Sequence, residues 1–351
     1  MNTKVLKVNE DTITGRTLLP AIQILKEGGL VAFPTETVYG LGADALDEEA
    51  AKKIYEAKGR PSDNPLIVHI ADVKSLETLA VEIPQVAYDL AEAFWPGPLT
   101  MILKKSDVVP YGTTGGLDTV AIRMPSNKIA MELIRESGLF IAAPSANSSG
   151  KPSPTLAEHV VYDLDGKIDM VVDGGKAVIG LESTIIDLST KTPCILRPGY
   201  ITKQMLERVI PTVSYDPVVN MKKANPSIHP KAPGMKYKHY APFGDLTIVE
   251  GNTEEVIKYI NQEVASLKTQ GKSVGVIATK ETKDSYKCDD IRCIGTRSND
   301  DTIAASLYAI LREFDEAKTE YIFSESFDDE ELGQAIMNRL IKASGYKIIH
   351  V

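Results

Sequence analysis

Two cationic side chains stand one glycine apart in the segment Lys58-Gly59-Arg60, which leads through a polar stretch into the apolar run LIVHI and His69. A short, stiffened turn of this kind lets both cations address one anion, the arginine as a two-pronged donor and the lysine as a point charge. The alternative is a solvated turn with both cations in water. In either case we expect loop cations that can be removed without unfolding the protein.

A run of small hydroxyl and amide side chains, APSANSSGKPSPT, begins at Ala143 directly after the apolar run LFIAA. Loops that leave the carboxyl ends of strands bind ligands in α/β proteins, and hydroxyls with free N–H groups suit phosphate or carboxylate. A flexible surface loop is the alternative. Pro144, Pro152 and Pro154 favour the rigid form.

Polar groups also interrupt runs that otherwise predict buried strands. Arg123 ends TVAIR, Ser183 begins STIID, and Arg197 precedes a Pro-Gly pair. A buried arginine is costly without a counter-charge, so an anionic ligand or an acidic side chain such as Asp187 or Glu182 is expected beside Arg123.

The elements that must position these groups follow from apolar periodicity. Apolar runs between the helices, many paired without an intervening helix, predict a twisted mixed sheet of about seven strands in the N-terminal part. Beyond residue 244, strands and helices alternate, which predicts a smaller parallel sheet wrapped by helices. The helices expected in the N-terminal part are Leu18 to Lys26, Glu48 to Ala57, Val86 to Phe94 and Lys128 to Glu136.

The chain has 351 residues, enough for two domains. We expect a catalytic domain over 1–210, a linker or lid over 211–244 that holds six prolines and a net charge of +4, and a C-terminal domain over 245–351. The net charge of the whole chain is −9, which disfavours a protein wrapped around nucleic acid.

Three cysteines without a C-x-x-C pair predict neither a disulfide framework nor a cysteine-rich zinc site, and they fit a reducing, cytoplasmic setting. The chain also lacks a signal-peptide pattern and any apolar run of the ~18 residues that a membrane span needs. No H-E-x-x-H or G-x-S-x-G signature occurs.

Taken in order, the motifs resemble a known family. They are PTETVYGLGADA, KGRPSDNPL, FWPGPLT, TVAIRMP, APSANSSGKPSPT, GLESTIID, ILRPG and APGMKYKHYAP. Their order and spacing resemble the long two-domain threonylcarbamoyl-AMP synthases, in which a YrdC-like domain precedes a smaller Rossmann-like α/β domain. Lys58, Arg60, Ser145 and Asn147 match the signature of that family.

The resemblance implies an enzyme that makes L-threonylcarbamoyl-adenylate and pyrophosphate from ATP, L-threonine and bicarbonate. It also implies that a separate transferase uses the product to modify tRNA. Such a reaction depends on positioning and on charge neutralisation, because a carbamate oxygen attacks the α-phosphorus of ATP in line. Mg²⁺ would be held mainly by the ATP phosphates.

The same resemblance assigns roles to individual residues. Lys58 and Arg60 would be catalytic, and Arg123 would pair with the carboxylate of threonine. In the linker, Tyr237, His239 and Tyr240 would belong to a lid, while Ala232 replaces a usual serine and removes its hydroxyl. The ATP contacts would be Arg60, Asn64, Thr119, Ser145, Asn147, Ser153, Arg197 and Tyr240, and the threonine contacts Thr35, His69, Arg123 and Ser183.

Two other functions stay open on the residues alone. The basic linker could serve an RNA-binding or regulatory protein, and direct contact with tRNA is undecided. A carbamoyl-adenylate-forming enzyme would use the same type of domain, but the paired cysteines and the acylphosphatase segment that accompany it elsewhere are missing here.

Overall fold

The computed structural model describes residues 2–220, 231–233, 239–328 and 330–351. The described chain forms two compact units, one of residues 2–149, 153–220 and 231–233, and one of residues 150–152, 239–328 and 330–351. Each is described by itself.

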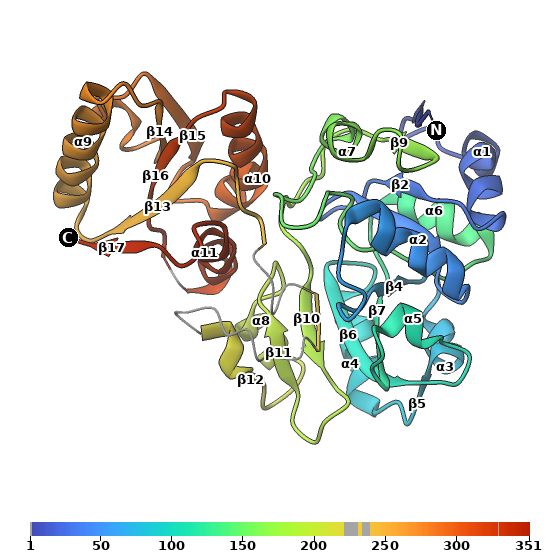
Figure 1. Cartoon of the computed structure of the whole chain (residues 1–351). Helices are drawn as coiled ribbons and strands as arrows, with labels where there is room; N and C mark the ends of the chain where they lie inside the picture. The colour runs from blue at the N-terminus through green and yellow to red at the C-terminus, as the bar shows by residue number, and fades with distance from the viewer. Residues whose placement is uncertain (1, 221–230, 234–238, 329) are drawn as a thin grey trace. The chain divides into compact units, whose positions relative to one another are not determined.

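A large mixed sheet is the centre of the first unit (Figure 1). Its order in the described chain is β1-β9-β2-β3-β8-β4-β7-β6-β10-β11-β12, with β5 paired to β6. Parallel and antiparallel pairs alternate irregularly, which confirms the mixed α/β class. The strands are β1 (Lys4–Lys7), β2 (Val31–Phe33), β3 (Gly40–Asp44), β4 (Ile67–His69), β5 (Ala80–Val81), β6 (Leu99–Lys105), β7 (Thr119–Arg123), β8 (Ile141–Ala142), β9 (Met170–Asp173), β10 (Thr184–Asp187), β11 (Cys194–Arg197) and β12 (Ser214–Tyr215).

Helices cover both faces of this sheet because successive side chains of a strand point to opposite sides. Val31 and Phe33 pack with α1 and α6, whereas Ala32 between them joins the core that α2, α4 and α7 cover. The helices of the unit are α1 (Gly15–Lys26), α2 (Glu48–Lys58), α3 (Leu76–Leu79), α4 (Gln85–Phe94), α5 (Tyr111–Thr114), α6 (Lys128–Ser137), α7 (Ala157–Leu164) and α8 (Lys203–Glu207).

The second unit contains a five-stranded sheet in which every pairing is parallel, as the sequence predicts. Its order is β15-β14-β16-β13-β17. The connection from β14 runs to β15 at one edge of the sheet, and the connection from β16 runs to β17 at the other edge. The elements are β13 (Asp245–Glu250), α9 (Thr253–Thr269), β14 (Val274–Thr279), β15 (Asp290–Gly295), α10 (Asp300–Glu316), β16 (Tyr321–Glu325), α11 (Glu331–Ala343) and β17 (Ile348–His350).

The predicted linker falls partly on described residues. β12 pairs in parallel with β11, and a 3-10 turn covers Pro217–Asn220. Residues 221–230 and 234–238, including Tyr237, lie outside the described residues. Among the helices that are described, none is both long and apolar enough to cross a membrane.

Candidate active site

Lys58 is the last residue of helix α2, and Arg60 follows it after Gly59. Asp47 caps the first turn of α2, and the helix ends at Lys58 because Gly59 takes the left-handed conformation, with φ of 60°. Lys58 and Arg60 are only 4% and 8% exposed. Both side chains are therefore part of the interior and not free cations of a loop, and that they can be removed without unfolding the protein stays a prediction.

Lys58 ties the end of α2 to the small-residue loop that follows β8. Its Nζ donates to the carbonyl oxygen of Ser145 and, at 2.5 Å, to that of Asn147. The Oγ of Ser145 donates to Asn147 Oδ1 at 2.6 Å, and the N–H of Ser149 donates to the Lys58 carbonyl at 2.8 Å. The loop is thus rigid at this end, and Lys58, Ser145 and Asn147 form one group.

Arg60 organises the turn that leads into β4. Its Nε donates to the Asn64 carbonyl at 3.2 Å and its Nη2 to the Pro65 carbonyl at 3.0 Å. Asn64 is 2% exposed, and among described atoms nothing donates to its Oδ1. Thr119 is the first residue of β7. Because β4 and β7 run parallel, with Ile67 opposite Ala121, Thr119 lies at the same end of the sheet as Asn64 and Pro65, which precede β4.

Arg123 ends β7 as a buried side chain with an acidic partner. Its Nη2 lies 2.7 Å from Glu36 Oε1, Nη1 donates to Thr37 Oγ1 at 2.9 Å, and Nε donates to the Gly97 carbonyl at 3.3 Å. Burial raises the pKa of Glu36, but the Arg123 guanidinium together with the backbone N–H groups of Ser126 and Glu36 outweighs burial and lowers that pKa below the usual value.

The acidic partner suggested from the sequence is thus a different one. Asp187 accepts from Ser189 and Glu182 from Ser153, so neither suggested carboxylate is the observed partner of Arg123.

His69 lies beside Arg123, because the two residues pair in register between β4 and β7. Its Nδ1 lies 3.2 Å from the Ile67 carbonyl, and its ring meets Phe33 edge-on at 6.4 Å between centroids. Burial, helped by the nearby guanidinium, lowers the pKa of His69 to about 3. The imidazole is therefore neutral at physiological pH.

A second buried arginine holds the hydroxyls that begin β10. Arg197 Nε and Nη2 donate to the carbonyl and the Oγ of Ser183 at 3.0 and 3.1 Å, and Ser183 Oγ lies 2.8 Å from Thr100 Oγ1. Arg197 Nη1 also donates to the Pro233 carbonyl at 3.4 Å. Thr100 is opposite Arg123 in the β6·β7 pairing, so this group adjoins the first arginine.

Residues 34–41 connect the groups. Within this segment Thr35 Oγ1 lies 2.7 Å from Thr37 Oγ1, which accepts from Arg123. The backbone of the segment bonds to the small-residue loop, through Leu41 N to Pro144 O and Ala146 N to Tyr39 O, and to the segment before Ser183, through Gly180 N to Thr37 O. Hydroxyls and cations from four distant parts of the chain are thereby gathered in one unit.

The last two predicted ATP contacts have partners of their own. Ser153 is buried and donates at 2.5 Å to Glu182, the neighbour of Ser183. Tyr240 belongs to the second unit, where it stacks on Tyr308 at 5.2 Å and has a positive φ of 66°.

Sequence reasoning missed the roles of Glu36, Thr37 and Thr100 as partners of the arginines and of Ser183. For Glu36 and Thr37 the signal available was a polar TETVY stretch between two buried strands, in which each polar side chain needs a partner. Among the described residues, no cluster of three or more His, Cys, Asp or Glu side chains forms a metal site.

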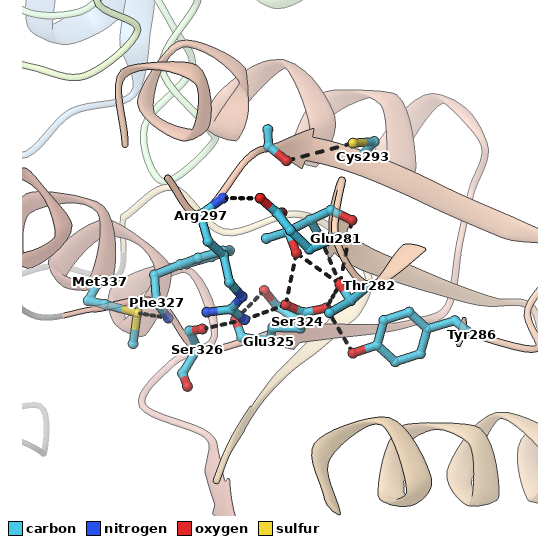
Figure 2. Close-up of polar contacts among 12 residues, drawn as sticks. Glu281, Thr282, Tyr286, Cys293, Arg297, Ser324, Glu325, Ser326, Phe327 and Met337 are labelled. Carbon is cyan, nitrogen blue, oxygen red and sulfur yellow. Dashed lines mark hydrogen bonds and ion pairs between the residues drawn. The ribbon is translucent and has the colours of Figure 1, made fainter. Parts of the chain in front are cut away.

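The second unit has a polar cluster of its own at the ends of β14 and β16, shown in Figure 2. The buried carboxylate of Glu325 accepts from Thr282, from Tyr286 at 2.9 Å and from Arg297. A cavity of about 50 Å³ adjoins it. None of the site predictions included these residues.

The fold and the site define an α/β protein of two units whose first unit gathers buried cations and hydroxyls around one segment. A family model described as "Telomere recombination" matches residues 23–199, and one described as "Threonylcarbamoyl-AMP synthase, C-terminal domain" matches residues 201–345. The chain is 52% identical to the threonylcarbamoyl-AMP synthase of Pyrococcus abyssi, over 94% of this chain and 95% of the relative. It belongs to the threonylcarbamoyl-AMP synthase family.

Other relatives agree. The threonylcarbamoyl-AMP synthase of Bacillus subtilis is 52% identical over 94% of this chain and 93% of its own length. A crystal structure of P. abyssi Sua5 complexed with L-threonine superposes with a TM-score of 0.93 at 49% identity, covering 99% of this chain and all of the other.

Proposed function

We propose that this enzyme makes L-threonylcarbamoyl-adenylate from ATP, L-threonine and bicarbonate, releases pyrophosphate, and supplies the adenylate to a separate transferase that modifies tRNA. The observation that supports it is the joining of the loop held by Lys58, the Arg123 group and the segment before Ser183 by residues 34–41. The threonine complex of the P. abyssi relative supports the choice of amino acid.

The chemistry has two steps. The ammonium of threonine gives up a proton to solvent, the freed amine bonds to the carbon of bicarbonate and water leaves. The resulting carbamate oxygen then attacks the α-phosphorus of ATP as pyrophosphate leaves. Positioning and charge neutralisation dominate both steps. Arg123 holds the carboxylate of threonine with help from Thr35, His69 and Ser183.

The ATP side of the site uses the remaining cations and hydroxyls. Lys58 and Arg60 stabilise negative charge on the phosphates, and the rigid loop of Ser145 and Asn147 offers hydroxyl and amide groups. Mg²⁺ enters with the nucleotide and is held mainly by its phosphates. The other proposed ATP contacts are Asn64, Thr119, Ser153, Arg197 and Tyr240.

The test is pyrophosphate release from ATP, Mg²⁺ and bicarbonate with no amino acid, with threonine, with serine or with carbamoyl phosphate, followed by mass analysis of the adenylate. We expect threonine-dependent release and the mass of threonylcarbamoyl-adenylate. Release with carbamoyl phosphate alone would instead identify a carbamoyl-adenylate-forming enzyme. No release in any arm, together with salt-sensitive binding of RNA, would identify an RNA-binding protein.

A further inference from the structure

The charge of Arg123 is already balanced before any substrate arrives. The side chains of Arg123 and Glu36 are 5% and 10% exposed, and their charged atoms are 2.7 Å apart. Gly97 and Thr37 hold the other edges of the guanidinium. The arginine is thus fixed in one orientation beside a carboxylate.

The residues that directly contact or pair with Arg123 add no further charge, and the next buried cation, Arg197, is separated from it by the hydroxyls of Ser183 and Thr100. His69, which pairs in register with Arg123, is neutral at physiological pH because burial holds its pKa at about 3. Thr100, on the other side of β7, is uncharged, and so is Thr37. The pair of Arg123 and Glu36 therefore has a net charge of zero in the interior.

This balance determines what can bind. A bare carboxylate on Arg123 would leave two buried negative charges sharing one cation, and an unpaired buried charge is strongly unfavourable. A zwitterion brings its own ammonium, two bonds from the carboxylate carbon, and keeps the net charge at zero.

Both carboxylate oxygens of Glu36 are buried. The Arg123 guanidinium and the backbone N–H groups of Ser126 and Glu36 lie near them, but among the described residues none of these donors gives either oxygen a well-directed hydrogen bond.

We propose that Glu36 is a specificity-determining residue, which balances Arg123 and accepts the substrate ammonium, so that the amino-acid site selects a zwitterion over a carboxylate without an amino group. This inference rests on the proposed function. It also orders the reaction, because N-carboxylated threonine has lost the ammonium. Threonine enters first, its ammonium then releases a proton to solvent, and the freed amine bonds to bicarbonate as water leaves.

The test is calorimetric titration of the full-length protein with L-threonine and with (R)-3-hydroxybutanoate, which keeps the carboxylate, the hydroxyl and the methyl group but lacks the amine. We expect the wild type to bind threonine at least about tenfold more tightly than the analogue, since a charge at close range is worth more than 1.4 kcal/mol at a partly buried site.

In the Glu36→Gln variant, the affinity for threonine should fall at least about tenfold, while the affinity for the analogue stays the same or rises. Glu36→Asp keeps the charge and should retain the preference for threonine. Glu92 is an exposed glutamate on α4, and Glu92→Gln is the matched control. It should change the affinity for neither ligand.

Three results would overturn the proposal, and they differ from one another. If Glu36→Gln weakens both ligands by the same factor, Glu36 only supports Arg123. If the wild type binds the analogue as tightly as threonine, the site does not select a zwitterion. This comparison uses the wild-type protein alone, so it does not depend on whether a variant folds. If the wild type binds neither ligand and releases no pyrophosphate with threonine, the proposed function fails first.

Discussion

Lys58 joins two parts of the candidate site that lie far apart in the sequence. Its ammonium donates to two carbonyls of the loop after β8, and its own carbonyl accepts from Ser149. A charged donor to buried carbonyls is worth more than a neutral one, and its removal leaves the acceptors unsatisfied. The residue therefore contributes to stability as well as to the proposed chemistry.

We predict that Lys58→Met, which keeps the aliphatic stem, lowers the free energy of unfolding of the first unit by about 2–4 kcal/mol. Pyrophosphate release should fall by about 100-fold or more. Unfolding in urea is followed by the fluorescence of Trp95, which is the single tryptophan of the chain and is buried in the first unit.

Lys52→Met, at a solvent-exposed position on the same helix, is the control for Lys58→Met and should cost less than about 0.5 kcal/mol. A Lys58→Met protein as stable as the wild type would show that the ammonium does not hold the loop.

His69 gives the first unit a pH dependence with a definite sign. The pKa is lowered to about 3 in the folded protein, so below the ordinary value of 6.5 the unfolded chain binds a proton that the folded chain does not. Folding is therefore weakened as the pH falls. Between about pH 7.5 and about pH 5 this amounts to about 2 kcal/mol.

We predict that His69→Gln loses this part of the pH dependence. The measurement is the difference between the free energies of unfolding at the two pH values, with unfolding followed by Trp95 fluorescence. The exposed His350→Gln variant is the control and should keep the wild-type difference. Equal pH dependence in His69→Gln and the wild type would mean that the imidazole is protonated in the folded protein.

At the scale of elements, the end of α2 depends on backbone conformation alone. Gly59 is left-handed at φ 60°, and an added Cβ would meet nothing within 4 Å. Gly138 ends α6 in the same way, at φ 66° and also in open space. An L-residue in this conformation costs about 1–2 kcal/mol.

We predict that Gly59→Ala and Gly138→Ala each destabilise the first unit by about 1 kcal/mol, and that Gly59→Asn recovers part of the loss because asparagine tolerates this conformation. Only the change at Gly59 should reduce pyrophosphate release, because Lys58 and Arg60 flank it. Equal activity of the two alanine variants would show that the angle between the cations is unimportant.

The helices were predictable because their signals are local. Asp47 caps α2, and the apolar period of α6 runs from its asparagine cap to Gly138. The predicted sheet of about seven strands was too small, because β5 and β12 have only two residues each and the glycine-containing β3 is not an apolar run.

The site was predictable in part for the same reason. The resemblance named Arg123, but the pairing with Glu36 joins segments that only the folded sheet brings together. The burial of Lys58 likewise depends on a loop far along the chain.

On the scale of the whole molecule, the first unit includes chain beyond residue 210. Val213 is buried in its core, and β12 pairs with β11 through Ser214 and Tyr215. Ala232 packs with Ile67 and Ile185 in a separate apolar cluster. The segment between the two units is thus partly structural.

We predict that a fragment of residues 1–220 is more stable than a fragment of residues 1–210, because it retains the buried side chain of Val213. Its free energy of unfolding, measured in urea, should be about 1.5–3 kcal/mol higher. Both lack Tyr237 and Tyr240, so both should release pyrophosphate more slowly than the full chain if those residues close over the nucleotide. Equal stability of the two fragments would show that β12 adds nothing, and full activity would remove the lid.

The strand order of the first sheet bears on how the protein is made. β1 pairs with β9, where Lys4 lies opposite Met170, and β6 pairs with β10, where Leu99 lies opposite Thr184. Pairings between such distant segments form slowly. During synthesis the first strand must wait for most of the unit to leave the ribosome, so the nascent chain exposes apolar strands for many seconds. We therefore expect the unfinished first unit to aggregate more readily than the completed one.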